Sequence, residues 1–409
     1  MLSVSEVEKI ILDLVKPFDP AIDSELLPLS QAIARVLAED VSSKLDFPHW
    51  DNSAMDGYAL RYADLEDLPE LKLAIAPDEI SAGISRSRSL ATGECIRIFT
   101  GGMLPNGADT VIMQEDVEPI DNFLYLKTKP THGEYVRHKG QYIQAGTTLV
   151  DSGTRITATE IGALAAARCP QVRAYRQPKI AIISTGNELV NLDSSQPLQA
   201  GQIIDSNIHA LSALITQAGA IAIPFGAIPD DLESLEKVMQ QAIASTDMVI
   251  STGGVSVGDY DYIDGLLEKL GAEIYVRSVA IKPGKPLTVA SLGKVLYFGV
   301  PGNPVSSMMS FWRFIRGAIA KLNGANSTYW YPQFIKATTT QDLHAQGRRE
   351  TYLWGKLTYE KGNPVFQPVS DYSSGNFISA IGANATAVMR VNQTYVSAGD
   401  EAIVMFLNG

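Results

Sequence analysis

The stretch KIAIISTGNE, residues 179–188, is an apolar run that ends in a polar turn containing glycine. Continuous apolar runs of this length are typical of strands that are buried on both faces of a parallel sheet. From residue 178 onward such runs alternate with segments of helical periodicity. We therefore predict a βαβ succession, in which a mostly parallel sheet lies between two layers of helices.

The alternation continues to about residue 325. The segment 232–243 has its apolar residues on one helical face, and the segment 304–322 repeats that spacing. We expect four strands, at KIAIIST, AIAIPFGAI, DMVIST and KVLYFGV, and four helices, at IHALSALITQAG, DDLESLEKVMQQAIAS, DYIDGLLEKLG and residues 304–322.

The segments on either side of this region have different sequence patterns. Ser3 with Glu6 and Thr157 with Glu160 are spaced as capping boxes, which predicts helices over 3–17 and after Thr157. A further helix is expected over 30–38. Between these helical segments, short β-type runs punctuated by Gly, Pro and Asn predict an inserted β-rich domain.

A chain of 409 residues is too long for one hydrophobic core, so several domains are expected. The tail after residue 325 is again rich in β-type runs and predicts a small barrel or sandwich. The expected division is a helical linker domain at 1–44 and 140–176, the inserted β-rich domain at 45–139, a central α/β/α domain at 177–325 and a C-terminal β-barrel at 326–409.

Composition narrows the class of protein. Hydrophobic residues make up 45% and charged residues 19%, as in folded globular proteins, and the net charge of −12 disfavours nonspecific binding to nucleic acid or to anionic membranes. The uncharged run 206–229 is long enough for a membrane span, but polar and helix-breaking residues interrupt it, which favours a helix followed by a strand.

The cysteines and the N-terminus indicate the compartment. Cys95 and Cys169 are the two cysteines of the sequence and form no Cys-x-x-Cys motif, which argues against a thiolate zinc site and favours reduced cysteines. The N-terminus carries acids where a signal peptide carries basic residues. A cytoplasmic location is therefore expected.

Three polar motifs follow apolar strands: STGNE at 184–188, STGGVSVGD at 251–259 and PGNP at 301–304. Ligands of open parallel sheets bind beyond the carboxyl ends of the strands. The glycines and serines of the second motif suit backbone N–H groups aimed at an anion, although it is neither Gly-x-Gly-x-x-Gly nor a Walker loop. A glycine-rich turn without a ligand is the alternative interpretation.

Basic and capping residues accompany these motifs. Asn303 suits a helix N-cap and Pro304 the first helical position, so PGNP also fits an ordinary helix start. In IKPGKP, Lys282 and Lys285 suit point charges beside a phosphate, or a solvated basic turn.

Acidic residues complete the set at 188, 230, 231, 259 and 261. Asp230 and Asp231 precede a helix, so either one also suits a cap. Carboxylates that face a phosphate-binding loop need a cation between them, and Mg²⁺ is the ordinary solution. The sequence therefore predicts a magnesium-assisted phosphate site.

The polar run DNSAMDGYA, residues 51–59, suits either a turn or one half of an active site whose other half lies elsewhere. Together with STGNEL, STGGVSVGDYDY, IKPGKP and VPGNPVSS, it resembles the molybdopterin molybdenumtransferases, known as MoeA in bacteria and as the E domain of gephyrin in animals. The five motifs appear with the expected spacing along nearly the whole chain. The central segment alone also resembles the adenylyltransferase of the same pathway and the CinA-type proteins, but the first 175 residues and the β-rich tail favour the molybdenum-inserting enzyme.

The resemblance implies a function and an assembly. Such enzymes take adenylylated molybdopterin and molybdate, cleave the phosphoanhydride with the assistance of Mg²⁺, release AMP and place molybdenum on the dithiolene. They form elongated homodimers whose cleft lies between the α/β domain of one subunit and the β-rich domain of the other. Contact with the adenylyltransferase of the pathway is also expected, and binding to nucleic acid or membrane is not.

The resemblance also assigns residues. Asp56, Glu188, Asp230 and Asp261 are the implied catalytic acids, the last three close to metal or molybdate. The implied substrate-binding residues are Thr100, Gly253, Gly254, Ser256, Gly258, Lys282, Lys285, Pro301, Gly302, Asn303, Arg348 and Ser374.

Two segments depart from the family pattern. Where the family often has Glu-Asp-Ile, this chain has Gln141, Tyr142 and Ile143, so the role of that acid is not carried over. The family's Gln-Gly-Ser signal is replaced by DYSSGN, from which Ser374 is taken. The alternatives to molybdenum insertion are a molybdopterin adenylyltransferase and a noncatalytic scaffold of the same fold.

Overall fold

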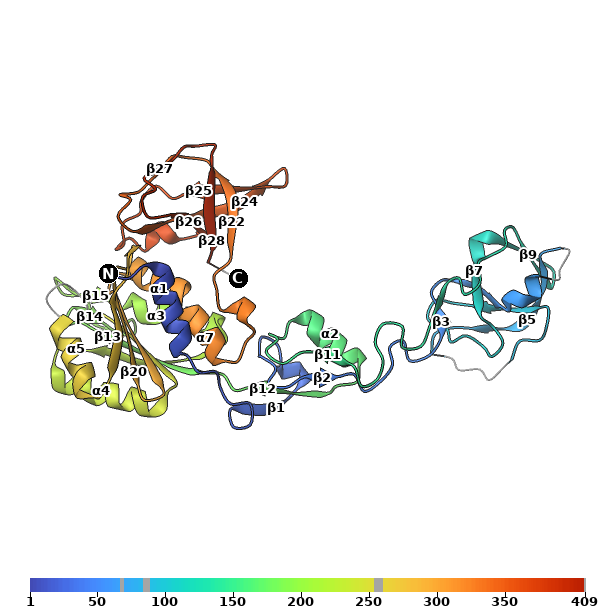
Figure 1. Ribbon diagram of the computed structural model, residues 1–409, viewed down its shortest axis with the longest axis horizontal. Helices are drawn as coiled ribbons and strands as arrows, with labels where there is room; N and C mark the ends of the chain where they lie inside the picture. Colours follow the sequence, from blue (N-terminus) through green and yellow to red (C-terminus); the bar gives the residue numbers. More distant parts are fainter. Residues whose placement is uncertain (67–69, 84–88, 254–259, 408–409) are drawn as a thin grey trace.

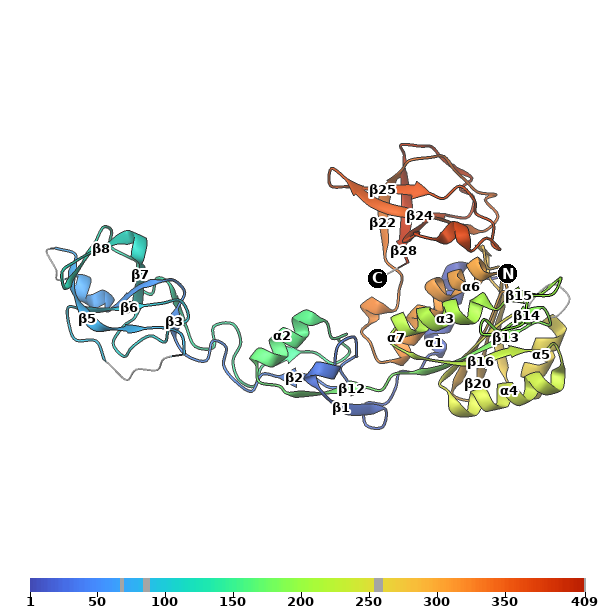
Figure 2. The same ribbon diagram turned by 180° about the vertical axis from the view of Figure 1, so that it is seen from behind.

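The computed structural model describes residues 1–66, 70–83, 89–253 and 260–407, with only the backbone described at 260–262. The chain is elongated (Figure 1). A body of helices and strands carries the C-terminal β-structure at one end, and a separate β-rich unit lies at the other end beyond a narrow connection (Figures 1 and 2).

The central sheet has six strands in the order β16-β13-β17-β21-β20-β18. The first four are parallel and are the four strands expected from the apolar runs, which confirms that prediction. At one edge, β20 pairs antiparallel with β21, and β18 pairs antiparallel with β20. Their bounds are β16 (Ile221–Ile228), β13 (Lys179–Thr185), β17 (Met248–Thr252), β21 (Val295–Val300), β20 (Pro286–Leu292) and β18 (Glu273–Ser278).

Helices cover both faces of this sheet. Alternate residues of β13 belong to different cores, since Ile180 and Ile182 pack with one layer of helices whereas Ala181 and Ile183 pack with the other. The three-layer α/β/α arrangement is therefore confirmed. The first layer contains α1 (Val4–Leu14), α3 (Ser206–Gln217), α6 (Pro304–Ser310), a π-helical turn (Phe311–Ile315) and α7 (Arg316–Leu322); the second contains α4 (Leu232–Ser245) and α5 (Tyr260–Lys269).

Helix α1 begins at the expected capping box, in which Ser3 accepts from the backbone N–H of Glu6 and the Glu6 carboxylate accepts from that of Ser3. Its apolar face packs on the α/β sheet. Glu8 on this helix forms an ion pair with Arg313, which is buried in the π-helical turn. The N-terminal helix is thereby fixed to the α/β body.

The prediction of a helix over 30–38 is wrong. Only a short 3-10 turn, Leu29–Gln31, forms there, and Ala34 has a φ of +62°, which a right-handed helix does not allow. Val36 and Leu37 instead form β-bridges with Arg155 and Ala174. Tertiary pairing with distant segments overrides the local helical preference.

The connecting segment, residues 18–44 and 140–176, contains strands as well as a helix and is not purely helical. Its helix α2 (Ala158–Ala166) starts at the expected Thr157–Glu160 capping box. Beside it lie two antiparallel pairs that the sequence analysis did not expect. They are β1 (Ser24–Pro28) with β12 (Gln171–Tyr175), and β2 (Val41–Ser42) with β11 (Thr148–Val150).

The β-rich unit is one six-stranded sheet in the order β7-β4-β6-β5-β9-β8, with a short pair β3–β10 at its base. The first residue of β4 is Gly57, and only glycine fits there, because a Cβ would lie 1.9 Å from the carbonyl oxygen of Ile112. The bounds are β3 (Asn52–Ser53), β4 (Gly57–Leu60), β5 (Lys72–Ile80), β6 (Glu94–Ile98), β7 (Thr110–Met113), β8 (Val117–Ile120), β9 (Phe123–Leu126) and β10 (Val136–Arg137).

The C-terminal strands close into a ring in which β24 pairs with both β25 and β26, so the expected small barrel is confirmed. Strand β19 (Ile281–Lys282), from the α/β segment, pairs with β24 and joins the two units. The barrel strands are β22 (Phe334–Thr339), β24 (Glu350–Glu360), β25 (Asn363–Pro368), β26 (Ala385–Met389) and β28 (Glu401–Phe406), with an adjoining pair β23 (Leu343–His344) and β27 (Tyr395–Val396).

Two further observations complete the fold. Within the described residues, no helix is long and apolar enough to cross a membrane. Cys95 and Cys169 are unpaired and buried, and burial raises the pKa of Cys95 to about 12. Both thiols thus serve as core side chains.

The central sheet gives a first prediction. Ile182→Ala, in the fully buried strand β13, should lower the free energy of unfolding by about 2–5 kcal/mol, because it leaves a cavity between sheet and helices. Ile221→Ala is the matched control, since Ile221 on the edge strand is 39% exposed and should cost about 1 kcal/mol or less. Urea and thermal unfolding of both variants measure the difference, and equal losses would contradict the assignment of the core.

Candidate active site

Three loops meet at the carboxyl ends of adjacent parallel strands. Ser184 on β13 is in register with Thr252 on β17, which is in register with Val300 on β21. The loops that follow approach closely, because a Cβ on Gly253 would lie 2.2 Å from the carbonyl oxygen of Thr185. Gly253 also has a φ of +91°, so only glycine fits this position without strain.

The PGNP turn lies against the same point. A Cβ built on Gly302 would lie 3.5 Å from the Cα of Gly253, so the second and third loops are in contact. Asn303 follows as the N-cap of α6 and Pro304 is its first residue, as expected. The positive end of the α6 dipole therefore faces the shared edge of the sheet, although Pro304 has no N–H and the N–H of Val305 already has an acceptor.

Asn207, which no sequence motif indicates, connects the second and third loops. Its side-chain amide donates to the Thr252 hydroxyl at 2.8 Å and to the Gly302 carbonyl at 2.7 Å. The Thr252 hydroxyl donates in turn to the Pro301 carbonyl at 3.2 Å. No local pattern distinguishes such an amide from an ordinary residue in the first turn of a helix.

Two of the predicted acids lie on neighbouring loops of this edge. Asn187 and Asp230 form reciprocal hydrogen bonds, in which each backbone N–H donates to the other side chain at 3.3 and 3.2 Å. This pairing places Asp230 beside Glu188, the next residue along the first loop. Both acids are exposed, so their carboxylates are accessible to a ligand.

Asp205 is a further acid near this edge and was also missed. It caps α3 by accepting from the N–H of Ile208, but it is buried and its second carboxylate oxygen, Oδ2, has no hydrogen-bond partner. Its backbone N–H donates to the Val190 carbonyl, within the short pair β14 (Leu189–Val190) and β15 (Ile203–Ile204) that follows Glu188. An Asp before a helix predicts a cap, and nothing in the sequence indicates its burial.

The lysine loop and the C-terminal unit approach α6 from the other side. A Cβ added to Gly284, which lies between Lys282 and Lys285, would be 3.5 Å from the carbonyl oxygen of Ser306. This loop therefore packs along α6. Ser374 lies at the start of α6, where its hydroxyl accepts from the Asn303 side chain at 3.3 Å and its carbonyl from the N–H of Val305 at 3.2 Å.

Arg348 stands two residues before β24, the strand that pairs with Ile281–Lys282. Its neighbour Arg349 donates to the carbonyl of Ile281 at 3.1 Å. Arg348 itself is exposed beside the lysine loop. The C-terminal unit thus brings cationic and hydroxyl groups to the region of the α6 N-terminus.

Four predicted residues are not placed. Gly254, Ser256 and Gly258 lie outside the described residues. Asp261 lies in the first turn of α5, but its side chain is outside the described part of the chain. Within the described residues, no cluster of three or more His, Cys, Asp or Glu suits a metal ion.

Asp56 and Thr100 form a separate local site in the β-rich unit. Both the N–H and the hydroxyl of Thr100 donate to Asp56 Oδ1 at 2.7 Å. The Thr100 backbone and then its hydroxyl, with a smaller contribution from the charge of Arg97, hold the pKa of Asp56 below its usual range. Asp56 is therefore an ionised carboxylate that is fixed at the turn before β4.

Aromatic side chains are exposed on the segments that lead into and out of the β-rich unit. Tyr142 is 59% exposed, and its ring lies 5.9 Å from that of Phe47. Trp50, close in sequence to Asp56, is also partly exposed and packs near His49. Lys139 and Asp46 form an ion pair beside Trp50 and His49, so this part of the surface carries charged as well as aromatic groups.

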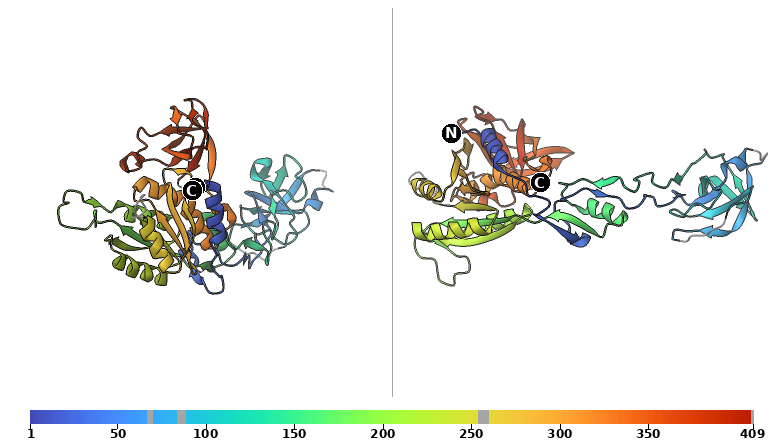
Figure 3. Two further views of the ribbon diagram at one scale, coloured as in Figure 1. Left: turned by 60° about the vertical axis from the view of Figure 1, so that its left-hand side comes forward. Right: turned by 60° about the horizontal axis from the view of Figure 1, so that its bottom comes forward.

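Within one chain, Asp56 and Thr100 do not meet the strand-end loops. The β-rich unit lies at the far end of the molecule from the α/β body in every view (Figures 1, 2 and 3). The structure therefore brings together the residues at the edge of the α/β sheet, whereas Asp56 and Thr100 do not contact them within one chain.

The strand-end site suits a phosphorylated ligand. It offers backbone N–H groups, a helix N-terminus, two lysines and an arginine for anionic oxygens, and exposed carboxylates for a bridging cation. Such an arrangement stabilises charge that develops on phosphate oxygens as a phosphoanhydride bond breaks.

Family models cover most of the chain. Residues 2–167 match the MoeA N-terminal region (domains I and II), residues 181–321 a probable molybdopterin-binding domain and residues 336–407 the MoeA C-terminal region (domain IV). These three segments run in the order that the sequence motifs predicted.

Relatives match along the whole length. A molybdopterin molybdenumtransferase of Nostoc sp. is 47% identical over 414 residues, covering 100% of this chain and 94% of that protein, and one of Haemophilus influenzae is 34% identical over 382 residues, covering 93% of each. The crystal structure of the molybdopterin biosynthesis MoeA protein of Pyrococcus horikoshii superposes with a TM-score of 0.83 at 28% identity, covering 99% of this chain and 100% of that one.

The bridging amide gives a second prediction. Asn207→Ala should lower the free energy of unfolding by about 1–3 kcal/mol, because it leaves the Gly302 carbonyl and the Thr252 hydroxyl without their buried donor. Asn191→Ala, on an exposed loop, is the control and should change stability by about 0.5 kcal/mol or less. Thermal unfolding distinguishes the two, and a neutral Asn207 variant would show that the three loops do not depend on this amide.

Proposed function

The chain belongs to the MoeA family of molybdopterin molybdenumtransferases, and from that membership we propose that it transfers molybdenum from molybdate to adenylylated molybdopterin with release of AMP. It is a transferase of molybdenum cofactor biosynthesis, since full-length relatives carry that name. The observation that supports the finer reaction is the meeting of three strand-end loops at the start of α6, where Gly253 lies against Thr185 and the Asn207 amide joins Thr252 to Gly302.

Each group at the edge has a role in this reaction. Cleavage of the phosphoanhydride moves negative charge onto the oxygens of the departing AMP and of the pterin phosphate. The positive end of α6 and the side chains of Lys282, Lys285 and Arg348 offset that charge. Gly253 allows the phosphate to approach the backbone, and Ser374 adds a hydroxyl beside Asn303.

We assign Mg²⁺ to the acids of this edge. When bound, Mg²⁺ offsets the charge on bridging phosphate oxygens. The exposed carboxylates of Glu188 and Asp230 fit it, because Mg²⁺ commonly takes one or two carboxylates together with phosphate and water. The unpartnered Oδ2 of Asp205 supports an electropositive ligand nearby, and Asp261 is the third acid of the proposed set.

Asp56 and Thr100 form the second wall in this proposal. Because they lie at the far end of the chain from the strand-end loops, we place them in the cleft of a second subunit of a homodimer (Figure 1). Asp56, ionised and fixed by Thr100, orients an attacking oxygen or molybdate there.

The remaining parts of the proposal concern organisation. We divide the chain into the linker segment at 1–44 and 140–176, the β-rich domain at 45–139, the α/β domain at 177–325 and the barrel at 326–409. Helix α1 is then a linker helix that packs on the α/β domain. We also propose a cytoplasmic location and transfer of substrate by contact with the adenylyltransferase.

The two alternative functions have weaker support. The adenylyltransferase reading rested on the central segment alone, whereas the family match includes the N-terminal and C-terminal regions. The scaffold interpretation depends on the missing acid at Tyr142, whereas Asp56, Glu188 and Asp230 are present with exposed side chains.

A direct assay tests the reaction. Purified protein with adenylylated molybdopterin, molybdate and Mg²⁺ should release AMP and form molybdenum-loaded cofactor, because the site offers donors for both phosphates. Chromatography of AMP measures the release, and omission of molybdate or of Mg²⁺ is the control. Absence of AMP release in the complete mixture rejects the proposal, and ATP consumption with free molybdopterin would favour the adenylyltransferase.

Subunit complementation tests the shared cleft. Asp56→Asn and Glu188→Gln should each fold like the parent and each retain less than about a tenth of its turnover, because each removes one wall's carboxylate. After the two variants are unfolded together and refolded as a 1:1 mixture, about a quarter of parental turnover should return, because half of the dimers are mixed and each has one intact cleft.

The control for this experiment is Asp121→Asn, in the exposed β8–β9 turn of the same β-rich unit, which should keep full turnover. Failure of the mixture to recover would show that Asp56 and Glu188 do not act in a cleft between two subunits. Recovery together with AMP release supports both the assembly and the reaction.

A further inference from the structure

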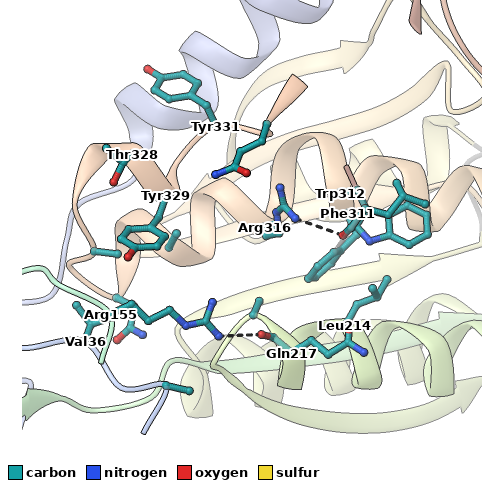
Figure 4. A pocket seen from close by; sticks show the side chains of 17 residues that line it. Val36, Arg155, Leu214, Gln217, Phe311, Trp312, Arg316, Thr328, Tyr329 and Tyr331 are labelled. Carbon is teal, nitrogen blue, oxygen red and sulfur yellow. Dashed lines mark hydrogen bonds between the residues drawn. The ribbon is translucent and has the colours of Figure 1, made fainter. Parts of the chain in front are cut away.

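A cavity of about 430 Å³ lies away from the strand-end site (Figure 4). Its wall combines the last turn of α3, the π-helical turn with α7, the segment that leads into the barrel and two loops of the connecting segment, which meet at the Val36–Arg155 bridge. The volume lies within the range of small-molecule sites.

Two arginines face this cavity from different elements (Figure 4). Arg155 donates to the carbonyl of Gln217 at 3.2 Å, and Arg316 donates to the carbonyl of Leu407 at 3.3 Å. Each of these hydrogen bonds uses one of five guanidinium donors. Neither arginine forms an ion pair with any described carboxylate, and the described lining contains no Asp or Glu.

The positive charge is incompletely compensated. Burial, followed by the charge of Arg155, lowers the pKa of Arg316. Elsewhere in this chain, a buried arginine has an acid, as Arg313 has Glu8. A half-buried pair of like charges without a counterion is unfavourable, so an anion in the cavity would stabilise it.

Two buried polar atoms of the lining also lack partners. Trp312 and Asn323 are 9% and 4% exposed, and neither Trp312 Nε1 nor Asn323 Oδ1 has a hydrogen-bond partner. By contrast, the indole N–H of Trp330 donates to the Ala325 carbonyl at 2.7 Å. Both atoms are closed off from solvent, so they do not contact a ligand directly, but they leave this wall of the cavity polar and incompletely paired.

The π-helical turn explains why these side chains reach the cavity. Its wider turn, Phe311–Ile315, places Phe311 and Trp312 in the lining, whereas Arg313 pairs with Glu8 away from it. π-Helical turns occur frequently at functional sites. Leu214 and Leu407 add apolar surface beside the two arginines, so the cavity suits an anion that has an apolar body.

We propose that this cavity binds a small organic dianion, a phosphate monoester or a dicarboxylate, between Arg155 and Arg316. Two cations match a dianion better than a single charge, and the apolar wall accommodates a carbon skeleton. The site is separate from the strand-end site: Asn207 and Gln217 lie ten residues apart on α3, which corresponds to about 15 Å along the helix.

Titration calorimetry tests the proposal on the full-length protein. The probes are phenyl phosphate, succinate and inorganic phosphate, with benzyl alcohol as a neutral analogue. We expect saturable 1:1 binding of phenyl phosphate or succinate, weaker binding of inorganic phosphate and none of benzyl alcohol. The tighter of the first two probes identifies the dianion as a phosphate monoester or a dicarboxylate.

Variants locate the binding. Arg155→Gln should weaken binding at least about tenfold, because it removes a charged bidentate donor, and Arg155→Lys should weaken it less. Arg173→Gln is the matched control, since Arg173 lies in the same connecting segment and pairs with Glu39 outside the cavity; its affinity should equal that of the parent. Lys282→Gln, at the strand-end site, should also leave the affinity unchanged.

A second readout covers any loss of folding in these variants. Phenyl phosphate should change the tryptophan fluorescence of the parent, and Trp312→Phe should abolish that change. Absence of saturable binding to the parent, or parental affinity in Arg155→Gln, overturns the proposal. Loss of binding in Lys282→Gln overturns it as well, because it would assign the probe to the strand-end site.

Discussion

The parallel register of β13, β17 and β21 is the constraint on which the candidate site depends. Because the three strands run side by side in one direction, their carboxyl ends and the loops that follow them reach the same edge. The loops approach so closely that Gly253 has space for a hydrogen atom only, and the Asn207 amide joins two of them. A change in the order or direction of any of these strands would separate the groups that we propose bind phosphate.

The shape of the chain adds a second constraint. The α/β body and the barrel are joined through β19, which crosses from one to pair with β24 of the other, and this places Ser374 at the start of α6. The β-rich unit is instead held at a distance by the paired strands of the connecting segment (Figure 1). One chain therefore presents two incomplete faces, which is the geometry that a reciprocal dimer requires.

Charge is distributed unevenly over this acidic molecule. Despite a net charge of −12, cationic and N–H groups gather where a phosphate would bind, and carboxylates stand beside them for a bridging cation. The cavity behind α7 differs, since its two arginines have no acid from the described lining to neutralise them. The same helix, running from α6 through the π turn to α7, thus begins at one site and lines the other.

Sequence alone determined the elements whose signals are local. The buried strands, the capping boxes at Ser3 and Thr157, the helix start at Asn303 and the polar strand-end motifs depend on residues that are adjacent in the chain. Only the tertiary structure decided the features that depend on distant contacts. Pairing with Arg155 and Ala174 replaced the expected helix at 30–38, and the burial of Asn207 and Asp205 gave roles to residues that look like ordinary helix caps. Hydrogen bonds and burial between segments far apart in sequence set these outcomes, so local periodicity carried no signal for them.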